Sequence, residues 1–245
     1  MKTLKYLQQF FILLFVGFAL YAVQACGNDG EDEPIQEPDK EEVVKPDEGE
    51  KDESDTFTGT INGHEWIDLG LSVKWATGNV GSSKPENYGD YYAWGETETK
   101  TEYTQYNSLT YGLSESQLQS QGYIDGSGNL TPSHDAARAN WGGTWRLPTK
   151  AELEELKNKC TWGRTAQNGV KGYKVTGPNG NSIFLPAAGR REGSSLKYAG
   201  ECGYCWSSTP DESDSDAYYP YFESGEHYMY RGSRYYGRSV RPVSE

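Results

Sequence analysis

Apolar residues along this chain stand in short runs between glycine and polar residues, and one segment repeats them with a clear helical period. Leu153, Leu156 and Cys160 recur at spacings of three and four residues, which places them on one face of a helix. Thr149 and Glu152 form a capping box, in which the hydroxyl and the carboxylate each accept a hydrogen bond from a free backbone amide. We therefore predict a helix that begins at Thr149, ends near Lys159 and buries its apolar face.

Alternating runs that flank turn residues predict short strands in the rest of the chain. The predicted pairs are residues 66–69 with 73–76, residues 173–176 with 182–185, and residues 217–223 with 226–231, followed by a closing strand over residues 239–243. Pro220 lies inside one of these strands and predicts an edge or a bulge, because proline has no backbone N–H to donate.

Two further stretches have a weaker pattern. Residues 88–130 are rich in Gly, Tyr, Thr and Ser with little periodicity, which predicts a long loop insertion with one short helix near Glu115. Alanines at 136, 137 and 139 predict a second, shorter helix over residues 134–140, with His134 at its start as a cap.

The first 25 residues have the pattern of a targeting signal. Lys2 and Lys5 precede an apolar run over residues 10–20, which is shorter than the roughly 20 residues of a membrane span. The small residue Ala25 before Cys26 resembles a bacterial lipobox. We therefore expect residues 1–25 to be a lipoprotein signal peptide and Cys26 to be lipidated and anchored in the outer membrane. An ordinary secretory signal followed by an unrelated cysteine is the alternative.

Most of the acidity of the chain lies in the next segment. Residues 27–55 hold 14 acidic residues against three lysines, a balance of −11, out of −13 for the whole chain. After the two lysines of the signal are counted, residues 56–245 carry −4. We expect residues 26–55 to form a disordered tether, because a block of one charge sign with few apolar residues cannot bury enough surface to fold. Neither part has the positive charge that a nucleic-acid partner needs.

The acidic run directly after Cys26 also resembles the export signal of Bacteroides-type lipoproteins displayed on the outer face of the cell. This resemblance predicts exposure at the cell surface, with a plain solvated linker as the alternative.

The richest feature of residues 56–245 is a concentration of tyrosine near the C-terminus. Eight tyrosines stand between Tyr204 and Tyr236, among Ser, Gly, Asp, Glu and Arg, where apolar residues are scarce. Tyrosine gives a large rigid contact area and a hydroxyl at low entropic cost, which is typical of a binding face. The other interpretation is that tyrosine suits half-exposed strands.

The sequence contains only weak candidates for a metal site or a redox-active cysteine pair. Asp211, Glu212, Asp214 and Asp216 are of the residue type that binds Ca²⁺, but they also suit a solvated loop, and we expect no metal. Cys202 and Cys205 have the spacing of a redox pair without a thioredoxin-like context, which leaves a local disulfide or two free thiols. Cys160 is interpreted as a packed thiol.

No constellation of nucleophile, acid and base stands out. The three histidines are scattered, at positions 64, 134 and 227, so we expect no catalytic residues and no cofactor. Arg146, beside Pro148, is expected to form a semi-buried ion pair rather than a ligand contact. The tryptophans at positions 66, 75, 94, 141, 145 and 206 are expected to build a core where aliphatic residues are few.

Several motifs together resemble a known family. They are Glu65–Ala76 (EWIDLGLSVKWA), Tyr91–Glu96 (YYAWGE), Asp135–Arg138 (DAAR), Trp141–Thr149 (WGGTWRLPT), Leu185–Gly189 (LPAAG), Trp206–Thr209 (WSST) and Ser239–Val243 (SVRPV). Over roughly residues 60–243 the chain resembles the Fibrobacter succinogenes major paralogous domain family, which is common in surface lipoproteins of Bacteroides-like bacteria. The tryptophan-rich motif before the predicted helix is the most specific of these segments.

The resemblance implies a C-type-lectin-like fold, shared with formylglycine-generating enzymes and with variable receptor proteins of phages and bacteria. We therefore expect residues 56–245 to form an α+β domain of short, twisted, mostly antiparallel strands with two helices and long loops. Such a fold implies no single activity. In the variable receptor proteins the C-terminal strands display diversified residues, and residues 218–238 occupy the equivalent place here.

These observations predict a non-catalytic surface module that binds a glycan or a protein. The ligand face is predicted from the outward residues of the last hairpin and the turn after it: Tyr218, Tyr219, Tyr221, His227, Tyr228, Tyr230, Arg231, Arg234, Tyr235 and Tyr236. Strand alternation allows only about half of the hairpin tyrosines to point one way. A structural or adhesin component of a surface assembly is the alternative, and an enzyme of the formylglycine-generating class is a remote one.

Overall fold

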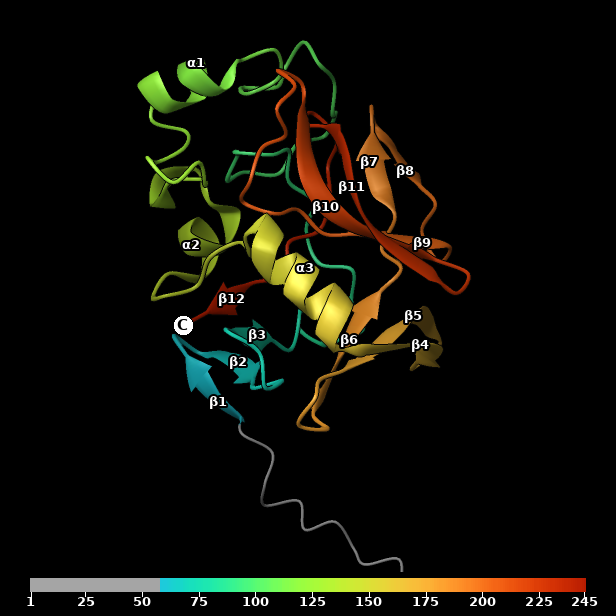
Figure 1. Ribbon diagram of the computed structural model, residues 1–245. Helices are drawn as coiled ribbons and strands as arrows, with labels where there is room; N and C mark the ends of the chain where they lie inside the picture. The colour runs from blue at the N-terminus through green and yellow to red at the C-terminus, as the bar shows by residue number, and fades with distance from the viewer. Residues whose placement is uncertain (1–57) are drawn as a thin grey trace, which may run out of the picture. The chain divides into compact units, whose positions relative to one another are not determined.

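The computed structural model describes residues 58–245, so the predicted signal peptide, Cys26 and the whole predicted tether lie outside the described residues. The described part lies in one unit of the chain and forms short, mostly antiparallel strands in four small sheets, with three α-helices and one 3-10 helix (Figure 1). The predicted α+β class is confirmed. None of these helices is long and apolar enough to span a membrane.

One sheet joins the start of the described chain to its end. It is ordered β1-β2-β3-β12, from β1 (Thr58–Ile61), β2 (His64–Ile67), β3 (Lys74–Ala76) and β12 (Val243–Ser244). Trp75 of β3 lies opposite both Ile67 and Val243, which confirms the predicted pairing around Gly70. Both ends of the described chain therefore meet in the same sheet (Figure 1).

The predicted closing strand over residues 239–243 is wrong for most of its length. Val240 and Pro242 accept backbone hydrogen bonds from Val80 and Ala76, and the first of these donors lies in an irregular segment beyond β3. Because no regular strand of the described chain lies beside residues 239–241, only Val243 and Ser244 continue a ladder.

A second sheet is a meander of three strands. It contains β4 (Thr161–Gln167), β5 (Val170–Thr176) and β6 (Ser182–Pro186), while β7 (Arg190–Glu192) and β8 (Ser195–Lys197) form a separate two-stranded hairpin. The predicted pairing of residues 173–176 with 182–185 is confirmed, with Tyr173 opposite Leu185. The strand β4 was not predicted, although it is seven residues long.

The predicted helices are present, but only one of the two predicted caps is confirmed. Helix α3 (Lys150–Lys159) begins with the complete capping box of Thr149 and Glu152, and its Leu153 and Leu156 are buried. Helix α2 (Ala136–Trp141) is capped by Asp135 rather than by His134, which lies in the preceding 3-10 helix η2 (Pro132–His134). The short helix near Glu115 is α1 (Glu115–Ser120).

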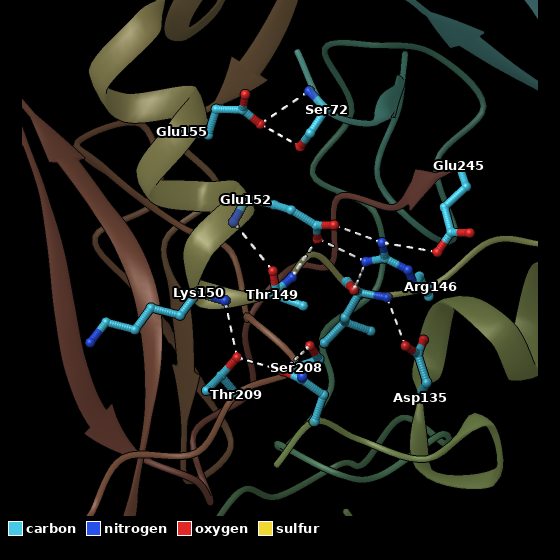
Figure 2. A network of polar contacts seen from close by, with 12 residues as sticks. Ser72, Asp135, Arg146, Thr149, Lys150, Glu152, Glu155, Ser208, Thr209 and Glu245 are labelled. Carbon is cyan, nitrogen blue, oxygen red and sulfur yellow. Dashed lines mark hydrogen bonds and ion pairs between the residues drawn. The ribbon is translucent and has the colours of Figure 1, made fainter. Parts of the chain in front are cut away.

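The tryptophan-rich motif organises the region around the start of α3. Figure 2 shows the guanidinium of Arg146 between Glu152, at 2.6 Å and 2.8 Å, and Glu245, at 3.7 Å, which confirms the predicted semi-buried ion pair. Asp135 accepts the backbone N–H of Leu147 at 2.7 Å, and burial raises its pKa to about 6 despite this bond. Thr209 accepts the backbone N–H of Lys150, which fixes α3 to the segment that leads into the last hairpin.

Tryptophan rings fill much of the core, as predicted. Trp75, Trp94, Trp145 and Trp206 are at most 1% exposed, Trp141 is also buried, and Trp66 is half-buried. The indole N–H groups of Trp94 and Trp206 donate to backbone carbonyls of residues 207 and 92, so their burial leaves no polar atom unpaired. Trp75 is the exception, since its indole nitrogen has no partner among the described residues.

A tyrosine-lined candidate binding site

The last hairpin forms the sheet that carries the candidate site. The sheet is ordered β11-β10-β9, from β9 (Cys202–Tyr204), β10 (Asp216–Glu223) and β11 (Glu226–Ser233), and its hairpin is the long pair of strands in Figure 1. The predicted turn at Ser224-Gly225 is confirmed, and both residues have positive φ, as a two-residue hairpin turn requires. The backbone N–H of Gly225 also donates to the hydroxyl of Tyr173, at 2.7 Å, which holds the tip of the hairpin against β5.

Pro220 lies within the central strand β10 and not on an edge strand, which corrects one prediction. The ladder between β10 and β9 covers only residues 221–223 of β10, because the backbone of Trp206 turns away to donate to Ser239. Pro220 therefore stands where the neighbouring strand has ended, and its missing N–H leaves no gap in a ladder.

Strand alternation separates the hairpin side chains into two sets. Tyr219 lies opposite Tyr230, and Tyr221 lies opposite both Tyr228 and Tyr204, so these five rings share one face of the sheet. The prediction that only about half of the hairpin tyrosines point one way is wrong, because four of the five share this face and only Tyr218 lies on the other. Four of the ten predicted residues, at positions 219, 221, 228 and 230, belong to this tyrosine face.

The opposite face packs on the protein interior. Phe222 is fully buried against Tyr173 and Trp162, and His227 stacks on Trp162 with ring centroids 4.7 Å apart. The ammonium of Lys150 lies 3.9 Å from the ring of Tyr218. His227 and Tyr218 were predicted to share a surface with the other tyrosines, and this is wrong because alternation places them on the other side.

The tyrosine face borders a hollow of about 510 Å³, which we call the tyrosine hollow. It is lined by Arg190, Tyr198, Glu201, Cys202, Tyr204, Tyr219, Tyr221, Glu223, Tyr228 and Tyr230. The lining therefore combines the three strands of this sheet with the start of the β7–β8 hairpin and the loop after it. A ligand would meet aromatic rings, hydroxyls, two carboxylates and one guanidinium there.

The rings form a graded surface from buried to exposed. Tyr204 and Tyr219 are about 5% exposed, whereas Tyr228 and Tyr230 at the rim are 43% and 60% exposed. The rings of Tyr221 and Tyr228 are nearly parallel, 10° apart, with centroids separated by 6.5 Å. The rim therefore presents two large rings to solvent, already oriented by contacts with the buried ones.

Two arginines that were not predicted as site residues, Arg238 and Arg190, lie close to tyrosine rings. The guanidinium carbon of Arg238 lies 3.5 Å from the ring centre of Tyr219 and 4.0 Å from that of Trp206. Burial lowers the pKa of Arg238 to about 10, so it remains a cation at neutral pH. Its Nε and Nη1 have no hydrogen-bond partner among the described residues, so its main contacts are with these rings. Arg190 lies 4.5 Å from the ring of Tyr236 and pairs with Glu192 at 3.1 Å.

The cysteines in and near the hollow are protonated thiols. Cys202, Cys205 and Cys160 are all free, which selects the free-thiol alternative. Burial raises the pKa of all three, to about 11 for Cys205 and Cys160. The thiol of Cys202 lies 3.3 Å from the carboxylate of Glu223 and 3.5 Å from the hydroxyl of Tyr221. At neutral pH these thiols lack the thiolate character of a nucleophile.

The remaining predicted ligand residues lie away from the hollow. Arg234 is fully buried and donates to the carbonyls of residues 110, 113, 213, 214 and 216, so its prediction as an outward residue is wrong. Tyr235 and Tyr236 are half-buried, with Tyr235 packed on Tyr111. Arg231 is exposed, but it lies on the same face as Tyr218.

The acidic loop before β10 is mainly structural. Asp211 is buried, and although burial raises its pKa, hydrogen bonds from the backbone of Ser213 and the hydroxyl of Tyr218 hold it below the usual value. Asp214 and Asp216 supply backbone carbonyls to Arg234. In the part of the chain that the structure describes, no three acidic, His or Cys side chains are grouped as metal ligands.

Comparison with known proteins gives one family. Residues 148–243, less than half of the chain, match the family described as Domain of unknown function (DUF8237). The matched segment begins at α3 and includes all three strands of the tyrosine face. No curated protein and no solved structure matches the chain.

Proposed function

We propose that this chain is a non-catalytic binding protein whose ligand occupies the tyrosine hollow. The observation that carries the proposal is the arrangement of the four hairpin tyrosines on one face, beside a hollow of about 510 Å³. Aromatic rings and hydroxyls that are already oriented lower the entropic cost of binding. Glycans, which stack on aromatic faces, and protein segments both suit such a lining.

The proposal includes the anchoring of the chain by lipid at Cys26 on the outer face of an outer membrane. It also includes a C-type-lectin-like arrangement of the described domain. Two features support this arrangement. Strands from the start and the end of the described chain pair in one sheet through β3 and β12, and a long irregular segment lies between β3 and α1. A replacement of Cys26 by Ser, followed by labelling with a radioactive fatty acid, tests the anchor.

The binding test uses residues 27–245 on glycan and peptide arrays. We expect a ligand that the native chain retains and that the double variant Tyr228→Ala, Tyr230→Ala loses by at least about tenfold, as for aromatic residues that carry much of a binding energy. Tyr106→Ala is the matched control, because Tyr106 is 90% exposed and does not line the hollow. Equal binding by the native chain and the double variant would contradict the proposal.

A further inference from the structure

The outer edge of β11 has backbone groups that the protein itself does not use. In a two-residue hairpin the residues flanking the turn bond to each other, so Glu223 pairs with Glu226 and every second residue of β11 bonds to β10. The N–H and C=O of Tyr218 confirm this phase, since they bond to Thr209 and Ser207 on the side away from β11. His227, Met229 and Arg231 therefore direct their backbone groups outward.

This edge lacks several of the features that keep another strand away, and Glu226 and Arg231 are its charged side chains apart from His227. Proteins usually block an exposed edge with proline, lysine, a bulge or a covering loop. Strand β11 is eight residues long, contains neither proline nor lysine, and pairs with β10 in unbroken register. Among the described residues, the backbone N–H and C=O groups of residues 227, 229 and 231 have no backbone hydrogen-bond partner outside the hairpin ladder.

Hollows lie on both sides of this edge. On one side is the tyrosine hollow, and on the other is a hollow of about 600 Å³ lined by Asp216, Tyr218, Met229, Tyr230 and Arg231. Tyr230, the most exposed ring of the hairpin, lines both. The side chains of an added strand alternate between the two faces of a sheet, so each set would enter one hollow.

The charges at the second hollow indicate what an added strand carries there. The side chain of Arg231 is 64% exposed, and its nearest carboxylate, Asp211, lies at 3.4 Å and already accepts other hydrogen bonds. Only Nη1 of Arg231 reaches Asp211 among the described residues, so its other guanidinium nitrogens can pair with a carboxylate from outside, in the bidentate geometry that guanidinium favours.

We propose that the ligand of the tyrosine hollow is an extended segment of a partner protein that adds to β11 as a further strand. Its backbone bonds to residues 227–231, its apolar or aromatic side chains lie on Tyr228 and Tyr230, and an acidic side chain pairs with Arg231. This inference rests on the proposed function and specifies the class of ligand.

The test begins with a display library of random peptides about ten residues long, selected on residues 27–245 and measured by calorimetry. We expect selected peptides to alternate aromatic and acidic residues and to lose at least about tenfold in affinity with Met229→Pro, which removes one outward N–H. Ala166→Pro is the control, because position 166 faces outward on the other open edge strand, β4, and should leave the affinity unchanged. Arg231→Gln should weaken peptides that carry the acidic residue.

A second measurement does not depend on whether Met229→Pro folds. The best peptide is synthesised with N-methyl groups on alternate residues, in the two possible phases. We expect one phase to abolish binding and the other to retain it, because only every second N–H of an added strand bonds to β11. Equal effects of the two phases, or full binding to Met229→Pro, would overturn the inference.

Two other outcomes separate this inference from the proposed function. Binding of a sugar that is lost in Tyr228→Ala, Tyr230→Ala, with no peptide selected, supports the proposed function and overturns the strand addition. Concentration-dependent self-association that Met229→Pro abolishes, again with no peptide selected, identifies a second copy as the occupant of the edge and also overturns it.

Discussion

Two hairpins of this protein share one backbone design and differ in almost everything around it. The β4–β5 hairpin turns at Asn168-Gly169 and the β10–β11 hairpin turns at Ser224-Gly225, with positive φ at all four residues. Each contains one strand of seven or eight residues, β4 or β11, whose outer edge has no ladder partner in the described chain. Both hairpins therefore have an open edge. If only one of them binds a ligand, the side chains around the edge must account for the difference.

The difference lies in aromatic content and in packing. Most residues of β4 are exposed, and the hollow of about 460 Å³ beside it is lined by polar and aliphatic residues with one aromatic ring, the buried Phe184. The β10–β11 hairpin instead buries Phe222 on one face and displays Tyr228 and Tyr230 on the other. A rigid base thus supports exposed rings only in the second hairpin, and the proposed binding face depends on this packing.

The largest expected effect comes from removing that base. Phe222→Ala should lower the free energy of unfolding by about 3–5 kcal/mol, because a fully buried ring leaves a cavity between Tyr173 and Trp162. Arg164→Ala, on the exposed β4 strand, should change it by less than about 0.5 kcal/mol. Denaturant titrations measure both, and similar costs for the two variants would remove the contrast between the hairpins.

The next largest effect on stability is expected from replacing a glycine of β9, with a glycine of β4 as the comparison. A Cβ on Gly203 of β9 would overlap the ring of Phe222, whereas a Cβ on Gly163 of β4 would meet nothing closer than 3.9 Å. Gly203→Ala should therefore cost about 1–3 kcal/mol, and Gly163→Ala should be nearly neutral. Thermal melts of the two variants check this, and a stable Gly203→Ala variant would show that the sheet under the hollow repacks easily.

Amide hydrogen exchange tests the shared part of the design. We expect fast exchange at the outward amides of residues 227, 229 and 231, and at 162, 164 and 166 of β4, with slower exchange at the alternate residues. NMR measurement of these rates uses the unmodified chain. Protection of the Met229 amide equal to that of Tyr228 would mean that the edge of β11 is already occupied.

The smallest expected effect comes from His227 of β11, whose ring contacts Trp162 of the other hairpin. Burial and then the charge of Lys157 lower the pKa of His227, which stacks on Trp162 of β4. The unfolded chain therefore binds a proton more readily, so this histidine makes the protein less stable as the pH falls through about 6.5. His227→Gln should reduce the pH dependence of unfolding between pH 7 and 5.5 slightly, and an identical pH profile would contradict the burial of this ring.

Local signals in the sequence predicted the parts of the fold that local chemistry determines. The capping box of Thr149, the turn at Ser224-Gly225 and the alternation of the last hairpin each depend on neighbouring residues. The strand β4 escaped prediction because Trp162 is its main apolar residue, although the dipeptide Asn168-Gly169 is a strong hairpin signal.

The candidate site could be predicted only in part, because some of its residues come together through tertiary contacts rather than through a local sequence pattern. Composition indicated the tyrosine hairpin, but the sequence could not show that Arg238 would lie beneath Tyr219 or that Arg190 would approach from another hairpin. Arg234 and Arg238 lie in a segment whose composition predicts exposure to solvent, yet both side chains are buried. Their positions depend on tertiary contacts with Trp94 and Trp206, for which no local pattern exists.

The order β1-β2-β3-β12 has a mechanical consequence. When the N-terminus is pulled against a ligand held in the tyrosine hollow, the force reaches β1 first, and β1 is joined by a ladder only to β2 through four residue pairs. An edge hairpin loaded from its free end opens one rung at a time, while β12 keeps its own pairing with β3. The ladder that opens first does not include the sheet that carries the tyrosines, so the first segment to yield can lengthen under tension while the contacts of the tyrosine hollow are kept.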